Sequence, residues 1–497
     1  MADTRRSGLS DKRLVGGGFT IQAAPESPQQ ATALTHATLI DGRGGPPMKD
    51  ITIIIRDGRI TAVGPSHETS VPAGTTVLEL RGRFVTPGFI DMHYHVTTGA
   101  MRYRRGPEGA LDSIYDRKVA ERLLRVALSR GITTIRDPGA SPVHVATELR
   151  DDVAQGRVLG PRIFTAGPML SSPRLSATDI RKAIRNQAAA GMDYIKLYSG
   201  ITPPQLRIAV EEAHRQGLKV IGHLQRTSWT EAAGSGIDYL THGSSWHEAY
   251  VPDARRAAYT ALGGSIRARI AWLEWLEPDS PAIDSMVAAL RRGGVSLDPT
   301  LVAYHTKFWW RDSIYQHDPD SALIPEVLSN WRVLGMPTAD WTANEFDRVQ
   351  AAWPKQLALI RRLHRAGVLL TAGSDLASPW VIPGTAFHQE LELLESTGIN
   401  RGEVLSIATR NGAQALGISA EVGTVETGKR ADLVILDADP LVDLRSTRRI
   451  RYVILGVRFT SPWIFWKAQV VRRVKIGNSA LHRNRAGIPV VPMPRAT

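Results

Sequence analysis

Two histidines follow an apolar segment at a spacing that lets them share one metal ion. The segment ends in Ile90-Asp-Met-His93-Tyr-His95, and residues two apart on a strand point to the same side. Imidazole nitrogens are good ligands for Zn²⁺ and similar divalent ions. A His-x-His pair alone fits a polar strand end or a packed histidine equally well, so its interpretation depends on further residues of this kind.

Three further residues of metal-ligand type each end a short apolar segment elsewhere in the chain. They are His223, His242 and Asp375. If these segments are parallel strands of one barrel, their ends meet at one mouth. The set then predicts a metal site built from nitrogen and carboxylate oxygen.

Lys196 has the same placement, in Tyr194-Ile-Lys196-Leu-Tyr, and has two interpretations. One is a barrel lysine paired with Asp375 or another acid. The other starts from desolvation, which lowers the pKa of a lysine and frees its amine. Two nearby cations would favour its conversion with CO₂ into a carbamate, which offers one oxygen to each metal ion.

The chain contains no cysteine among its 497 residues. This excludes disulfide scaffolds, thiolate zinc sites, iron–sulfur clusters and cysteine nucleophiles. A metal ion must therefore be held by histidine, carboxylates or a rarer ligand.

The elements that would position these residues alternate in a βα pattern, which predicts a (β/α)₈ TIM barrel. Four amphipathic runs at 117–130, 179–190, 205–215 and 282–292 separate short apolar segments, and the long connections after Gly243 and Leu301 predict insertions over the barrel mouth. The eight predicted strands are 84–95, 133–137, 162–167, 194–199, 219–223, 239–243, 296–301 and 368–375.

Short β-rich runs on both sides of this alternating region predict a small β-sandwich domain built from both chain ends. Asp-Gly turns before alternating apolar residues, as at Asp57-Gly58, are typical of hairpins. The predicted organisation is a polar extension at 1–32, β-domain parts at 33–84 and 419–475, the barrel at 85–418 and a basic tail at 476–497.

Several motifs together resemble the amidohydrolase superfamily, from about Ala33 to Phe459. The order of His-x-His, Lys, His, His and Asp matches, as does the closing Gly423-Thr-Val-Glu-Thr-Gly-Lys-Arg-Ala-Asp-Leu-Val434. Within the superfamily, the sequence is similar to the imidazolonepropionase-related and prolidase-like branch, which includes Xaa-Pro dipeptidases and ochratoxin-hydrolysing amidases.

The resemblance implies a binuclear site, most simply with two Zn²⁺ ions. His93, His95 and Asp375 would hold the first ion, His223 and His242 the second, and carbamylated Lys196 would bridge them. A bridging hydroxide would attack an amide carbonyl, and Asp375 would pass the proton to the leaving amine. The implied catalytic residues are Asp375, Lys196 and His242.

Substrate contacts are less specified by the sequence. The segment after the fifth strand reads His223-Leu-Gln-Arg-Thr-Ser-Trp229, where dipeptidase-like relatives often have His-Ala-Tyr. This departure puts simple Xaa-Pro specificity in doubt. Candidate carbonyl or carboxylate ligands are Tyr198, His247, His305 and Arg136. For Arg136, the neighbouring Asp137 favours a structural ion pair instead.

Ten of the twelve tryptophans lie in the part of the chain that carries the long connections. Aromatic walls suit a bulky or aromatic substrate group, although helix packing and subunit contacts explain most tryptophans equally well. The ten are Trp229, Trp246, Trp272, Trp275, Trp309, Trp310, Trp331, Trp341, Trp353 and Trp380.

The net charge is +13, from 61 basic and 48 acidic residues, and the surplus is scattered. Basic runs at 102–105, 445–451 and 472–483 lack the interleaved aromatics of a nucleic-acid module. No apolar run approaches the roughly 20 residues that span a bilayer. The first thirty residues lack the apolar core of a signal peptide. We therefore expect a cytoplasmic chain, or one whose leader has already been removed. We also expect a homo-oligomer that acts on a small molecule, without a nucleic-acid or membrane partner.

These inferences predict a metal-dependent amidohydrolase that cleaves an amide or peptide-like C–N bond. The expected substrate is an N-acyl amino acid or dipeptide with a bulky or aromatic group. A lactone, carbamate or phosphoester hydrolase, or a deaminase, would use the same site. The alternative from another class is a non-catalytic scaffold, which the survival of all six ligand types disfavours.

Overall fold

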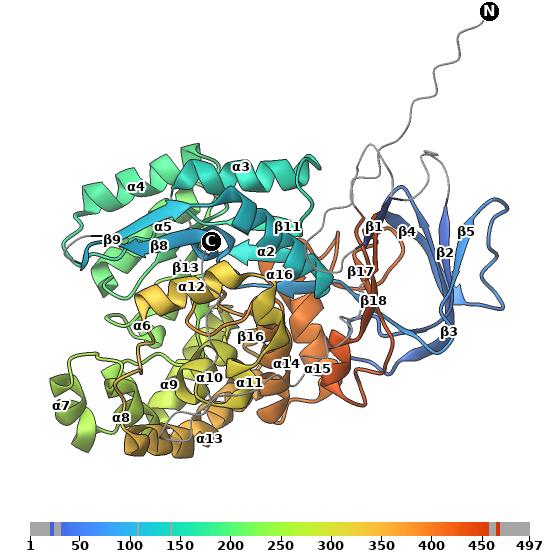
Figure 1. Cartoon of the computed structure of the whole chain (residues 1–497). Coiled ribbons are helices and arrows are strands. Elements are labelled where there is room, and N and C mark those ends of the chain that lie inside the picture. Colours follow the sequence, from blue (N-terminus) through green and yellow to red (C-terminus); the bar gives the residue numbers. More distant parts are fainter. Residues whose placement is uncertain (1–19, 24–30, 107–108, 140–141, 457–463, 468–497) are drawn as a thin grey trace, which may run out of the picture.

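The computed structural model describes residues 20–23, 31–106, 109–139, 142–456 and 464–467. A large part of alternating strands and helices lies beside a smaller part made of strands (Figure 1). The basic run at 472–483 and the predicted tail at 476–497 lie outside these residues, as does most of the extension at 1–32. In the part of the chain that is described, no helix is both long and apolar enough to cross a membrane.

Eight parallel strands form the centre of the large part, in two sheets ordered β11-β10-β7 and β12-β13-β14-β15-β16. Single parallel bridges from Ala166 to Tyr194 and from Tyr94 to Leu376 connect the two sheets. The strands are β7 (Phe89–Asp91), β10 (Ile132–Asp137), β11 (Arg162–Thr165), β12 (Tyr194–Leu197), β13 (Lys219–Gly222), β14 (Tyr239–Thr241), β15 (Ser296–Asp298) and β16 (Leu369–Leu370).

Helices follow these strands and bury one apolar face each, as the amphipathic pattern predicts. In α2 (Arg117–Ser129), Leu123 and Leu124 are fully buried, and the Asp116 side chain caps the first turn by accepting from two backbone N–H groups. The other helices of this layer include α3 (Val143–Ala154), α4 (Ala177–Ala189), α5 (Pro203–Arg215), α6 (Trp229–Gly234), α9 (Pro281–Arg292), α14 (Thr385–Ser396), α15 (Arg401–Ser406) and α16 (Gly412–Leu416).

The two long connections form helical insertions. The one between β14 and β15 contains α7 (Asp253–Ala261) and α8 (Ala268–Trp275) ahead of α9. The one between β15 and β16 contains α10 (Leu301–Trp309), α11 (Ser313–Gln316), α12 (Pro325–Leu334) and α13 (Ala343–Arg365). After β7 come α1 (Val96–Gly99) and a hairpin of β8 (Met101–Arg105) and β9 (Leu111–Tyr115), so the basic run at 102–105 is part of a strand pair.

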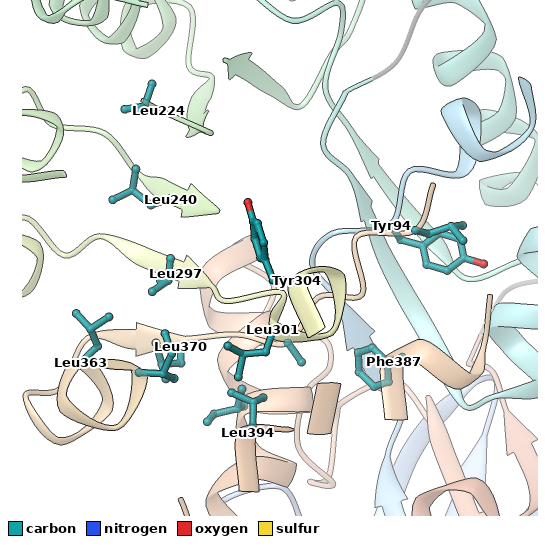
Figure 2. Close-up of a cluster of buried hydrophobic side chains, with 14 of the residues drawn as sticks. Tyr94, Leu224, Leu240, Leu297, Leu301, Tyr304, Leu363, Leu370, Phe387 and Leu394 are labelled. Carbon is teal, nitrogen blue, oxygen red and sulfur yellow. The ribbon is translucent and has the colours of Figure 1, made fainter. Parts of the chain in front are cut away.

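Apolar side chains from the last strands and from the insertion helices pack into one core (Figure 2). Leu240, Leu297 and Leu370 come from neighbouring strands and are at most 1% exposed. Leu301 and Tyr304 extend this core from α10, and Leu363 extends it from α13. The insertion helices are thereby held against the strand ends that carry the candidate site.

The smaller part is a nine-stranded sheet to which both ends of the described chain contribute. Its order is β1-β19-β18-β17-β6-β2-β3-β4, with β5 paired to β2, and its blue and red strands lie together in Figure 1. Its two-layer sandwich arrangement stays a prediction. The strands are β1 (Thr20–Ala23), β2 (Thr32–Leu39), β3 (Met48–Arg56), β4 (Arg59–Pro65), β5 (Thr76–Glu79), β6 (Phe84–Pro87), β17 (Leu433–Leu436), β18 (Ile450–Ile454) and β19 (Ile464–Lys467).

All eight predicted strands have somewhat different limits in the structure, most of them shorter, and β16 covers only Leu369–Leu370 of the predicted 368–375. Two of the differences have a clear structural reason. The segment 84–95 is two strands, because β6 pairs with β17 in the small sheet and β7 begins only after Gly88. A Cβ on Gly88 would lie 2.1 Å from the Thr133 hydroxyl oxygen, so the close approach of β10 requires glycine there. The segment 296–301 ends as a strand at Asp298, and Leu301 already belongs to α10.

Candidate metal centre

His93, His95 and Asp375 come together because the chain after β7 pairs with the chain after β16. The Asp375 amide donates to the His93 carbonyl at 2.7 Å. Asp91 accepts from the amides of both His93 and Ser374 at 3.0 Å, so one buried carboxylate fixes both segments. Burial raises the pKa of Asp91 to about 7.

The ligand atoms of these three residues all lie within 4.8 Å of one another. The Nε2 atoms of His93 and His95 are 3.2 Å apart. Asp375 Oδ1 is 3.3 Å from the first of these atoms and 3.6 Å from the second. Two imidazole nitrogens and a carboxylate oxygen facing one point form a donor set that could hold a divalent metal ion.

Asp298 fixes the His93 ring from behind and was missed by the sequence prediction. Its Oδ2 lies 2.6 Å from His93 Nδ1, and Arg136 donates to its Oδ1 at 2.7 Å. Burial raises the pKa of Asp298 to about 7, and the charges of Arg136 and Lys196 lower it. The carboxylate accepts a hydrogen bond from the Nδ1–H group of His93, so the lone pair of this ring is on Nε2. Asp298 ends β15, so the strand-end rule that selected the other residues could have found it.

His223 and His242 form a second pair, directly after β13 and β14. His242 Nε2 lies 2.8 Å from His223 Nδ1, and His242 Nδ1 lies 2.7 Å from the Thr300 hydroxyl oxygen. His223 Nε2 is buried without a hydrogen-bond partner in the described structure. Burial, with positive charges such as Lys196 nearby, lowers the pKa of both rings well below the usual value. Both rings are therefore neutral and carry lone pairs, as metal ligands must.

Lys196 lies on β12 with its side chain enclosed between the two histidine pairs. The residue is 1% exposed, and its Nζ has no hydrogen-bond partner in the described structure. Burial lowers the pKa of this amine to about 8, against the opposing charges of Asp298 and Asp375. A buried amine without a partner is costly, so the position of Lys196 calls for a group that is absent from the described residues.

Backbone strain is concentrated at the ends of the strands that carry these candidate ligands. Of nine non-glycine residues with positive φ in the described ranges, six lie in the segments that follow β14, β15 and β16. Such conformations cost of order 1–3 kcal/mol each and cluster at functional sites. The six are His242 (φ 71°), Trp246 (φ 51°), Thr300 (φ 44°), Asp375 (φ 56°), Ala377 (φ 84°) and Trp380 (φ 63°).

A cavity of about 280 Å³ opens onto these residues. Its wall also includes Tyr198, Arg269, Tyr304, Lys307 and Ser378. Lys307 Nζ donates to the Ser378 hydroxyl at 2.9 Å, and that hydroxyl donates to Asp375 Oδ2 at 2.9 Å. Burial lowers the pKa of Lys307 to about 8. This chain of contacts holds the outer oxygen of Asp375 while its inner oxygen faces the histidines.

Of the four candidate substrate contacts, only Tyr198 lines this cavity. His247 lines a neighbouring cavity. His305 points away from the site, stacked on Trp309 at 4.1 Å and 2.5 Å from the Tyr315 hydroxyl oxygen. Arg136 is 0% exposed beneath the site, so a substrate cannot reach it, and its ion-pair partner is Asp298 rather than Asp137.

The tryptophans mainly build the packing around the site. Trp229, Trp272 and Trp331 are almost completely buried. Trp246 is the only one of the ten that lines either of the two neighbouring cavities within the described residues.

Residues 84–474 match the amidohydrolase family. The chain belongs to this family. Imidazolonepropionase of Chromobacterium violaceum is 24% identical over 447 residues, covering 81% of this chain and 89% of that protein. Imidazolonepropionase of Symbiobacterium thermophilum is 27% identical over 421 residues, covering 79% and 87%.

Solved structures agree with this assignment. A candidate prolidase from Bifidobacterium longum is 27% identical with a TM-score of 0.64, covering 86% of this chain and 93% of that chain. Ochratoxinase of A. niger, at 19% identity, has a TM-score of 0.60 over 86% of this chain and 95% of that chain, a likeness of fold alone. This amidohydrolase therefore has a TIM-barrel-type α/β fold and is a hydrolase acting on C–N bonds.

Proposed function

We propose that this amidohydrolase is a binuclear enzyme that hydrolyses an amide or peptide-like bond. The proposed substrate is an N-acyl amino acid or dipeptide with a bulky or aromatic group. The observation that carries the proposal is the convergence of six donor groups, in which Lys196 Nζ and His223 Nε2 are buried without hydrogen-bond partners in the described structure. The lone pair at His223 Nε2 would be matched by a cation, and Lys196 would offer oxygens to cations once its amine is converted into a carbamate.

The proposed ligand set divides into two halves around Lys196. His93, His95 and Asp375 would hold one Zn²⁺ ion, and His223 and His242 the other. Lys196, as a CO₂-derived carbamate, would contribute to both. The set requires eight strands closed into one ring, and the bridges that connect the two sheets support this closure.

The bound ions and the side chains of the site have separate roles in the proposed reaction. Bound divalent ions would lower the pKa of a shared water and polarise the scissile carbonyl. Asp375, with its outer oxygen fixed by Ser378, would accept the water proton and return it to the leaving amine nitrogen. His242, fixed by Thr300, orients the carbonyl side of the site, and Tyr198 and Tyr304 enclose the substrate.

Metal content and a substrate panel test this proposal together. Zinc-loaded protein should contain about two ions per chain and should hydrolyse some N-acyl amino acids or dipeptides. Lactones, carbamates, phosphoesters and aminopurines complete the panel, and preference for one of these would replace the amide assignment. Protein that binds no more than about one ion per chain after zinc loading would contradict the binuclear site.

A further inference from the structure

A second cavity, of about 570 Å³, lies beside the metal-centre cavity and has one wall residue in common with it. That residue is Arg269, at the start of α8. The second cavity is polar, and its wall includes Ser199, Gln225, Arg226 and His247. A molecule bound at the metal centre could therefore extend past Arg269 into this space.

Aromatic rings fix the position of Arg269. Its guanidinium carbon lies 5.3 Å from the centre of the Trp246 ring and 5.2 Å from that of Tyr304. Trp246 adopts its positive φ with its carbonyl accepting from the Tyr259 hydroxyl at 2.7 Å and its Nε1 donating to Tyr304 at 3.3 Å. Cation–π contacts of this kind leave the edge of the guanidinium free to donate hydrogen bonds.

The Arg269 side chain makes no ion pair or hydrogen bond within the described residues, although most arginines of the fold are paired with acids. Arg226, three residues after His223, lines the same cavity and is likewise without an acidic partner there. The acidic residue of this wall is Glu248, whose Oε2 accepts from the Thr260 hydroxyl. The wall thus presents two cations against one carboxylate.

We propose that Arg269 and Arg226 form an anion subsite that binds the free carboxylate of the substrate while the scissile bond lies at the metal centre. This inference rests on the proposed amide hydrolysis and adds to it the side chains that recognise the carboxylate of the substrate. The planar guanidinium fork matches the two oxygens of a carboxylate. Neutral amides and esters of the same acids are then poor ligands.

The position of Arg226 bears on specificity. The segment after β13 contributes Gln225 and Arg226 to the wall of the second cavity, so a basic side chain follows closely on the ligand His223. The space beyond Arg269 also accommodates a longer acid than a single proline. Because Arg269 lines both cavities, the subsite takes acyl amino acids as short as a glycine conjugate from the metal-centre side, and the larger cavity accommodates longer ones.

The test compares an acid with its neutral amide in the zinc-loaded full chain. The probe is 4-oxo-4-phenylbutanoate, in which a methylene replaces the amide nitrogen of N-benzoylglycine, and its primary amide is the neutral counterpart. Calorimetry should show the wild type binding the acid at least about tenfold more tightly than the amide, as expected for a charge-assisted hydrogen bond. Neither probe can be hydrolysed, so the measurement does not depend on turnover.

Arg269→Gln should remove most of this preference, and Arg226→Gln should reduce it. Arg255→Gln is the matched control, because Arg255 also lies over a tryptophan, 5.5 Å from Trp275, but lines neither cavity. This control should keep the preference. With N-benzoylglycine as substrate, Arg269→Gln should raise KM about tenfold and change kcat little.

The subsite is overturned if the wild type binds acid and amide equally, if it binds neither, or if Arg269→Gln keeps the preference. The last result would assign the carboxylate to the metal ions instead. Failure of the proposed function gives a different result: the zinc-loaded wild type would then hydrolyse no amide of the substrate panel, even if calorimetry shows that it binds the acid.

Discussion

Buried nitrogen atoms without partners are the feature that makes the candidate centre chemically distinctive. Lys196 Nζ and His223 Nε2 are buried without hydrogen-bond partners in the described structure, in the same enclosed space where the Nε2 atoms of His93 and His95 approach to 3.2 Å. Burial lowers the pKa of His223 well below its usual value, so this ring carries a lone pair that a cation would satisfy. The histidine rings keep these orientations because Asp298 contacts Nδ1 of His93 and Thr300 contacts Nδ1 of His242.

Replacing Lys196 by Ala should reduce both metal occupancy and activity, because it removes the proposed bridge. Added short carboxylic acids should restore part of both by supplying two oxygens. Metal analysis and turnover with increasing acetate or propionate would measure this. Lys219→Ala is the matched control: it removes a lysine at the start of β13, whose Nζ contacts Tyr239 and the Ala415 carbonyl outside this cavity, and it should leave the metal content unchanged. Full turnover of Lys196→Ala without added acid would contradict the bridging role.

Asp298→Asn should weaken metal binding about 10- to 100-fold, the usual effect of losing the carboxylate behind a ligating histidine. It should also lower the free energy of unfolding by about 3 kcal/mol, because Arg136 would remain buried without its counter-charge. Competition with a chelator and urea unfolding would measure the two effects.

Asp320→Asn provides the comparison, since Asp320 pairs with Arg130 far from the ligands in sequence and is also buried. That variant should lose stability and keep its metal affinity. Equal metal affinities of the two variants would show that Asp298 does not orient His93.

Strand ends could be located from the sequence because apolar runs that stop at a polar residue are local signals. His93, His95, Lys196, His223 and Asp375 all follow from such signals and line one cavity. The division of 84–95 could not be predicted in this way, because it depends on β6 pairing with a strand far along the chain.

The insertion helices were predicted only as long connections. Arg269 and Lys307 reach the cavity from α8 and α10, and their positions depend on tertiary packing against Trp246 and Ser378. No periodic pattern marks such residues. Arg136 shows how far local signals reach: the sequence favoured an ion pair with Asp137 over substrate contact, whereas the structure encloses Arg136 beneath the site and pairs it with Asp298.

The segment after β16 also sets how closely Asp375 approaches the histidines. A Cβ on Gly373 would lie 2.7 Å from His93 Cβ and 3.2 Å from its amide nitrogen. Gly373→Ala should therefore displace His93 and reduce metal affinity about tenfold or more while every ligand is retained. Gly45→Ala, where an added Cβ meets nothing within 4 Å, is the control. Unchanged zinc affinity in Gly373→Ala would show that the segments after β7 and β16 can move apart without loss of metal binding.

Buried histidines outside the centre make the whole molecule sensitive to acid. Burial lowers the pKa of His305 to about 4, and that of His388 well below its usual value. The unfolded chain binds these protons near pH 6.5. Between about pH 6.5 and 4 the unfolded state thus holds more protons, so the free energy of unfolding falls as the pH falls.

For His305 alone this loss should reach about 2 kcal/mol at pH 5. Urea unfolding from pH 7 to pH 5 would measure it. In His305→Phe the free energy of unfolding should change less steeply with pH, by up to the contribution of one proton. His67→Gln, at an exposed surface position, should follow the wild type. An unchanged slope in His305→Phe would mean that the ring takes up its proton in the folded state.

The antiparallel pair of β6 and β17 joins residues about 350 positions apart in the chain. During synthesis, β6 emerges from the ribosome long before its partner exists, and its edge stays unpaired while the whole barrel is made. Such distant pairing slows folding and exposes the nascent chain to aggregation. The same arrangement ensures that the sheet is completed only after every metal-binding segment has been translated.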